Sequence, residues 1–113
     1  MSTDPVAVPE ELAEWLTARL EEIARQLRAA RGVARQHPDN GERWVLGMLA
    51  ATTDIEAEAK KIVHLLTAYG LRSKVTTAAP IARACGVTIS SVTSRAGGRI
   101  ASDTWNEVWP SQR

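Results

Sequence analysis

The chain has 113 residues, of which 44% are hydrophobic and 24% charged, and its formal net charge is +1. This length predicts one compact domain, or a small domain with one long appendage, and oligomerisation would help to stabilise so short a chain. A single cysteine, Cys85, excludes an intramolecular disulfide and a cysteine-based metal cluster. No apolar run approaches the roughly 18 residues of a membrane span, and no basic-then-apolar leader is present. We therefore expect a cytoplasmic protein without a membrane partner.

The first third of the chain predicts one long helix. Residues 1–9 contain prolines and no periodicity, so we expect a flexible leader there. The helix is predicted to begin at Pro9 and Glu10, with acidic residues in its first turns, and to stop at the turn residues 37–41. Its apolar residues recur at steps of four and three, close to a heptad pattern. They are Leu12, Leu16, Leu20, Ile23, Leu27, Ala30 and Ala34.

A second helix is predicted from Glu42, with Gly70 as its C-cap. Both helices would be about 27 residues and roughly 40 Å long, which predicts an antiparallel hairpin over residues 10–70. The second helix is apolar on more than one face, around residues 44–51 and 62–66. We therefore expect the hairpin to dimerise as a four-helix bundle or to pack along the C-terminal module. The stripe of the second helix comprises Trp44, Met48, Ala51, Ile55, Ala59, Ile62, Leu66 and Tyr69.

Residues 76–98, TTAAPIARACGVTISSVTSRAGG, predict a short helix, a glycine turn and a second short helix. Gly86 can adopt the left-handed backbone of a tight turn, and Thr88 is a plausible N-cap for the second helix. Ala82 is small enough for the two helices to cross closely. A small core is expected from Ile81, Cys85, Val87 and Val92, which makes Cys85 a buried structural thiol.

This segment resembles the helix-turn-helix of bacterial DNA-binding proteins, and IARACGVTISSVTSR is especially similar to the corresponding segment of LacI-type repressors. The resemblance covers about a fifth of the chain. It implies that the second helix enters the major groove, where its N-terminal part and outward face contact base edges. Arg95 departs from the pattern, because these motifs often carry an apolar residue there, and it is a candidate phosphate or base contact.

The distribution of charge favours nucleic acid as the partner of this segment. Residues 1–70 carry eight Lys or Arg against eleven Asp or Glu, whereas residues 71–113 carry six against two. Such a positive segment is typical of a phosphate-contacting module, although a chance cluster of solvated arginines is the alternative. Candidate base contacts are Thr88, Ser90, Ser91, Thr93, Ser94 and Arg95, with Arg95 the best candidate for guanine readout. Candidate phosphate contacts are Lys74, Arg83 and Arg99.

A last short helix is predicted after Gly97 and Gly98, with Asp103 as its N-cap. Trp105, Val108 and Trp109 would share one side of this helix. We expect them to close the small core under the turn motif, with a dimer contact as the alternative.

Nothing in the sequence favours an enzyme. His37 and His64 stand alone, without neighbours at metal-ligand spacing, and no phosphate-binding loop or nucleophile motif is present. We therefore expect no catalytic residues, no cofactor and no metal.

The resulting prediction is an all-α protein with a leader (1–9), a dimerising helical hairpin (10–70) and a C-terminal helix-turn-helix module (71–113). The leading hypothesis is a nucleoid-associated, sequence-specific transcriptional regulator, which binds double-stranded DNA as a homodimer on a palindromic operator. One alternative is an architectural or assembly DNA-binding factor, as in phage packaging or plasmid maintenance. The other is an all-helical protein-interaction adaptor without DNA binding.

Overall fold

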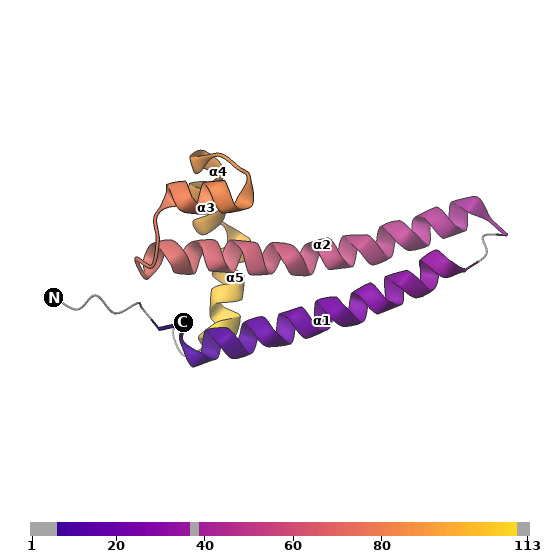
Figure 1. The fold of residues 1–113 in the computed structure, drawn as a ribbon, viewed down its shortest axis with the longest axis horizontal. Coiled ribbons are helices and arrows are strands. Elements are labelled where there is room, and N and C mark those ends of the chain that lie inside the picture. The colour runs from indigo at the N-terminus through magenta and orange to yellow at the C-terminus, as the bar shows by residue number, and fades with distance from the viewer. Residues whose placement is uncertain (1–6, 37–38, 111–113) are drawn as a thin grey trace.

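The computed structural model describes residues 7–36 and 39–110, which form five α-helices and no strand (Figure 1). The all-α prediction is confirmed for this part of the chain. Most of the predicted leader and part of the turn at 37–41 lie outside the described residues. The molecule is elongated, with principal extents of 65 × 29 × 28 Å. The helices are α1 (Glu10–Arg35), α2 (Gly41–Arg72), α3 (Ala78–Cys85), α4 (Ile89–Ala96) and α5 (Arg99–Val108).

The two long helices lie side by side and run in opposite directions (Figure 1). Pro9 directly precedes α1, as predicted, and its carbonyl accepts a hydrogen bond from the Ala13 amide at 3.1 Å. At the start of α2 the side chain of Asn40 accepts a hydrogen bond from the Arg43 amide at 3.0 Å. Such a cap satisfies one of the free amides at a helix N-terminus. The helix boundaries therefore follow from local signals at both positions.

Gly70 is not the C-cap of α2, so that prediction is wrong. The helix continues to Arg72, and Ser73 is its C-cap. The Gly70 carbonyl accepts hydrogen bonds from the amides of Val75 and Thr76, at 3.0 and 3.2 Å. A Cβ atom on Gly70 would lie 3.2 Å from Thr76 Cγ2 and 3.4 Å from Ile81 Cδ1. The following segment folds back closely onto the helix here, so a side chain at position 70 would require Thr76 and Ile81 to shift.

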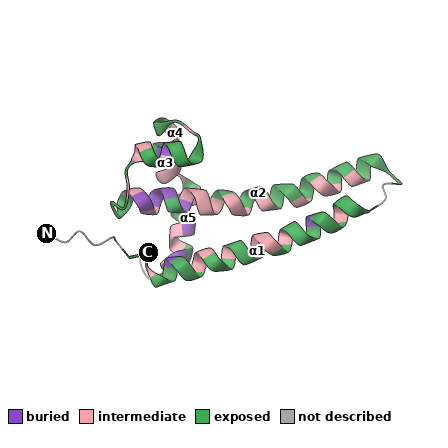
Figure 2. Cartoon of the chain, viewed as in Figure 1, coloured by how far each residue is buried: buried purple, intermediate pink, exposed green. Residues whose placement is uncertain are grey.

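The main core lies at the end of the hairpin where α1 begins and α2 ends (Figure 2). Leu12, Leu65 and Val108 are buried together there, so one residue each comes from α1, α2 and α5. Four half-buried aromatic side chains pack around them: Trp15, Tyr69, Trp105 and Trp109. Trp105, Val108 and Trp109 therefore pack on the base of the hairpin, and the prediction that they close the small core under the turn motif is wrong.

The last helix begins earlier than expected. Gly98 occupies the N-cap position of α5, and Asp103 lies inside the helix, so the predicted Asp103 cap is wrong. The Asp103 carboxylate instead pairs with Arg99 one turn earlier, at 3.6 Å. A carboxylate and a guanidinium at i and i+4 are neighbours on a helix surface, so the aspartate is compatible with the helix interior.

Candidate nucleic-acid interface

The turn between α3 and α4 has the predicted backbone conformation. Gly86 is left-handed, with φ 67° and ψ 37°, and the Val87 amide donates to the Ala82 carbonyl at 3.0 Å. The Thr88 hydroxyl oxygen accepts a hydrogen bond from the Ser91 amide at 3.1 Å, so Thr88 is the N-cap of α4. These two local interactions end α3, begin α4 and determine the path of the chain between them.

The packing beneath this turn agrees in part with the small core predicted from the sequence. Val92 is fully buried and Ala82 nearly so, whereas Ile81 and Val87 are half-buried. Cys85 is exposed, so the prediction of a buried thiol is wrong. Cys85 is the last residue of α3, and it lies at the edge of a shallow hollow against α2.

The outward face of α4 carries small hydroxyl side chains. Ser90, Thr93 and Ser94 are exposed, and they point away from the buried Val92 because of the helical period. Ser91 is half-buried, and its hydroxyl accepts a hydrogen bond from the Thr88 hydroxyl at 3.1 Å. Thr88 and Ser91 therefore serve the helix start, and the Thr93 hydroxyl donates to the Ile89 carbonyl at 3.2 Å while the Thr93 side chain stays exposed. Ser90 and Ser94 lie beside it and are also exposed.

Exposed cationic side chains lie on the elements next to α4 in the chain, and acidic ones are missing from residues 71–102. Between residues 71 and 102 the sequence has five Lys or Arg and no Asp or Glu. Lys74 and Arg83 are exposed, in the loop before α3 and on α3 itself. The Arg99 side chain is almost fully exposed, and it shares an ion pair with the exposed Asp103. Exposed pairs of this kind are weak in water, so Arg99 remains accessible to another anion.

Arg95 does not belong to the outward face. It is half-buried and lines a hollow together with Lys60 and His64 of α2. Burial, followed by the positive charges of Arg95 and Lys60, lowers the pKa of His64 below its ordinary value. The shared hollow places the Arg95 side chain against α2.

Three features of this region were not anticipated from the sequence. Ile89, the first residue of α4, is 54% exposed beside the serines. The Arg72 guanidinium lies 4.6 Å from the centre of the Trp105 ring, a cation–π contact between α2 and α5. A Cβ atom on Gly98 would lie 3.2 Å from the Ser94 carbonyl oxygen. The sequence signal for the close approach at Gly98 is the Gly97-Gly98 pair, because residues without a Cβ atom allow α5 to start close to the end of α4.

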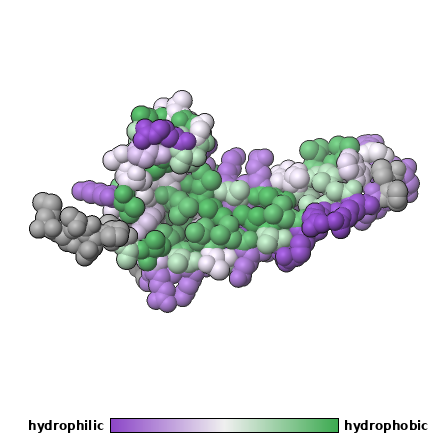
Figure 3. Space-filling view, viewed as in Figure 1, coloured by the Kyte–Doolittle hydropathy of each residue, from purple (hydrophilic) through white to green (hydrophobic). Residues whose placement is uncertain are grey.

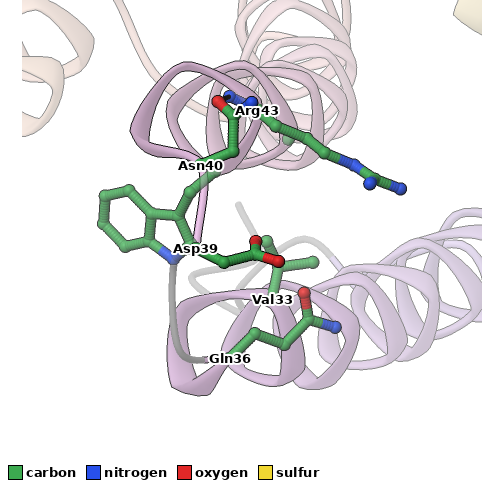
Figure 4. Close-up of a pocket in the computed structure, with 7 residues that line it drawn as sticks. Val33, Gln36, Asp39, Asn40 and Arg43 are labelled. Atoms are coloured by element: carbon green, nitrogen blue, oxygen red, sulfur yellow. Dashed lines mark hydrogen bonds between the residues drawn. The ribbon is translucent and has the colours of Figure 1, made fainter.

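The far end of the hairpin contains a separate hollow of about 430 Å³ (Figure 4). It is open and is lined partly by Asn40, Arg43 and Trp44, whose buried indole nitrogen has no hydrogen-bond partner among the described residues. Across residues 7–36 and 39–110, no group of three or more His, Cys, Asp or Glu is arranged to hold a metal ion. None of the described helices combines the length and apolarity required to cross a membrane.

Comparison with known proteins adds no relative to this description. No family model matches the chain, and neither a curated protein nor a solved structure is significantly similar to it.

Proposed function

We propose that this protein is a sequence-specific DNA-binding regulator that acts as a homodimer on a palindromic site, with α3 and α4 as a helix-turn-helix. The observation that carries the proposal is the outward face of α4, where Ser90, Thr93 and Ser94 are exposed within a segment that has cations and no acids. Hydroxyl groups at such a face can contact base edges in the major groove. The turn at Gly86 and the cap at Thr88 support the same assignment.

The phosphate contacts in this proposal come from Lys74, Arg83 and Arg99, whose side chains are exposed around α3, α4 and α5. Arg95 has a different role from the one that the sequence favoured. Because it lies half-buried against α2, it holds α4 in place and adds positive potential, while base readout rests on the hydroxyl face. The half-sites would then be distinguished mainly by hydrogen bonds from short side chains.

The experiment selects bound sequences from a genomic DNA library and then measures affinity for the selected site by fluorescence anisotropy. Thr93→Glu places a carboxylate on the proposed contact face, so we expect at least a tenfold loss of affinity. Thr53→Glu makes the same change at an exposed position of α2 outside residues 71–113, and we expect its affinity to stay within about twofold of the wild type. Equal affinities of the two variants would contradict the assignment of the face.

Salt dependence provides a second, independent measurement. Each phosphate neutralised by a cation lowers the slope of log affinity against log salt by about 0.9 for duplex DNA. Arg83→Ala should therefore make the slope shallower by about one, with little change in sequence preference. A wild-type affinity that does not respond to salt would rule out phosphate binding.

An architectural or assembly factor is the second candidate, and one observation favours it. Val45, Leu46 and Leu49 are 46%, 57% and 56% exposed near the far end of α2. An additional apolar surface of this kind could join dimers into a larger assembly on DNA. Closed oligomers larger than a dimer, measured by light scattering with and without DNA, would favour this candidate over a simple operator-binding dimer.

A further inference from the structure

Most residues in the apolar stripes of the two long helices lie beside the seam between the helices, although Leu12 and Ala30 of α1 are buried in it. At about 100° per residue, the seam is occupied by positions near Leu12, Arg19 and Gln26 on α1. Arg19 donates from this seam to Glu58 of α2 at 3.3 Å. The α1 stripe is rotated to one side of the seam, and Leu20 and Leu27 are therefore 52% and 49% exposed.

The stripe of α2 is rotated to the same side. On antiparallel helices, positions turned in the same sense from a shared seam come to lie on one common face. Together the two stripes form what we call the front face. It comprises Leu16, Leu20, Ile23 and Leu27 of α1 with Met48, Ile55, Ala59, Ile62 and Leu66 of α2. Figure 3 shows this continuous apolar surface over both helices, with hydrophilic residues along the outer edge of α1.

The other helices of the chain cover different sides of the hairpin. α5 packs on the opposite face, where Ile100 and Thr104 line a hollow with Ala57 and Lys61 of α2. α3 and α4 lie along the outer edge of α2, beside Val63 and His64. The hairpin therefore packs against the C-terminal module, which was one of the two predicted alternatives. Within the described part of the chain this module leaves the front face uncovered except at Ala59, which lines the hollow against α3 and α4.

The amount of exposed surface indicates a missing neighbour. A compact monomer of 12.3 kDa exposes about 6,100 Å² by the size scaling of folded proteins, whereas this chain exposes 7995 Å². Its radius of gyration is 17.5 Å, compared with about 13 Å for a compact domain of this length. At 1.5 Å per residue the front face spans about 27 Å along α2 and about 17 Å along α1, so across two helices of about 10 Å each it covers roughly 450 Å². This is more than half of the roughly 800 Å² that one partner buries in a complex of standard size.

We infer that the front face is the homodimer interface, on which the front face of a second copy packs to form a four-helix bundle. None of its nine residues is charged, so it has no electrostatic feature that would select a different partner. A twofold interface joins the same surface of both copies, and an uncharged flat face is complementary to itself. Four antiparallel helices around an apolar centre are a common stable arrangement. The interface itself does not depend on the proposed function. Only the role of the dimer, which is to bring two α4 helices to one DNA site, rests on that proposal.

The test measures the mass of the full chain in solution without DNA, by size-exclusion chromatography with multi-angle light scattering at micromolar concentration. The wild type should have twice the mass of one chain. Leu20→Glu combined with Leu27→Glu places charges on the front face and should give the single-chain mass of 12.3 kDa. Leu46→Glu combined with Leu49→Glu is the matched control, because these leucines are equally exposed but lie on the back of α2. This control should remain a dimer.

Circular dichroism shows whether each variant keeps its helices. If the glutamate pair unfolds the chain, the neutral pair Leu20→Gln and Leu27→Gln should still raise the dimer dissociation constant at least tenfold, while Leu46→Gln with Leu49→Gln leaves it unchanged. A monomeric wild type, or a dimer disrupted only by the back-face pair, would overturn the inference. A dimer that binds no DNA would overturn the proposed function alone, and a monomer that binds DNA would overturn this inference alone.

Discussion

The base and the tip of the hairpin have similar helical sequences but are stabilised differently. At the base, Leu12 of α1 and Leu65 of α2 are buried because α5 adds Val108 and two tryptophans. Toward the tip, Ala30 is the only described residue of α1 that is buried, and Val45, Leu46 and Leu49 of α2 are exposed. Two helices alone cannot cover their apolar sides, so burial at the base depends on a third helix. The tip lacks such a helix within the described chain, and it should contribute less to the stability of the monomer.

The largest effect that tests this contrast is expected from Leu65→Ala. Leu65 is fully buried, and removing its side chain should leave a cavity that costs about 2–5 kcal/mol in the free energy of unfolding. Leu46→Ala removes the same atoms at a 57% exposed position near the tip, where a change within about 0.5 kcal/mol is expected. Urea unfolding at one fixed protein concentration measures both. Similar losses at the two positions would show that base and tip do not differ as described.

Two glycines provide a smaller test of the same contrast. Gly70→Val at the base forces a side chain against Thr76 and Ile81, and such overpacking should cost about 1–3 kcal/mol. Gly32 lies in the tip half of α1, and no neighbouring atom lies within 4 Å of a Cβ built there. Gly32→Ala should therefore stabilise the protein by about 0.5–1 kcal/mol, because alanine favours a helix. The midpoint temperature of thermal unfolding should fall for Gly70→Val and rise for Gly32→Ala. A Gly70→Val variant more stable than the wild type would contradict the close approach of Thr76 and Ile81 to Gly70.

The local signals in the sequence were sufficient for most helix boundaries. Pro9 before α1, Gly86 after α3 and Thr88 before α4 act through their own backbone or their nearest turn, so each was predicted correctly. Gly70 and Asp103 are residue types that are common at helix ends, but both lie inside helices. Their roles inside helices depend on Ile81 and Arg99, whose contacts arise only in the folded chain.

The candidate interface shows the same distinction. The hydroxyl face of α4 was predictable because its period relative to Val92 depends on one helix. Arg95 follows Val92 by three positions, so the helical period places it near the packed side of α4, in agreement with the apolar residue that the resembling motifs often carry there. Its charge alone made it a candidate contact. Which side of α4 meets α2 also depends on the position of Lys60 and His64, and this information is absent from the motif itself.

The smallest expected effect concerns the contact between α2 and α4, and it depends on pH. The pKa of His64 is lowered in the folded chain by burial and by Arg95 and Lys60, so the unfolded chain takes up the proton more readily. The folded state is therefore favoured most above the ordinary histidine pKa of about 6.5, and it loses stability as the pH falls below this value. Urea unfolding at about pH 7.5 and pH 5.5 should show this loss, and His64→Gln should reduce it. A wild-type stability that rises on acidification, or a loss that persists unchanged in His64→Gln, would show that His64 is not the group responsible for the pH dependence at the contact between α2 and α4.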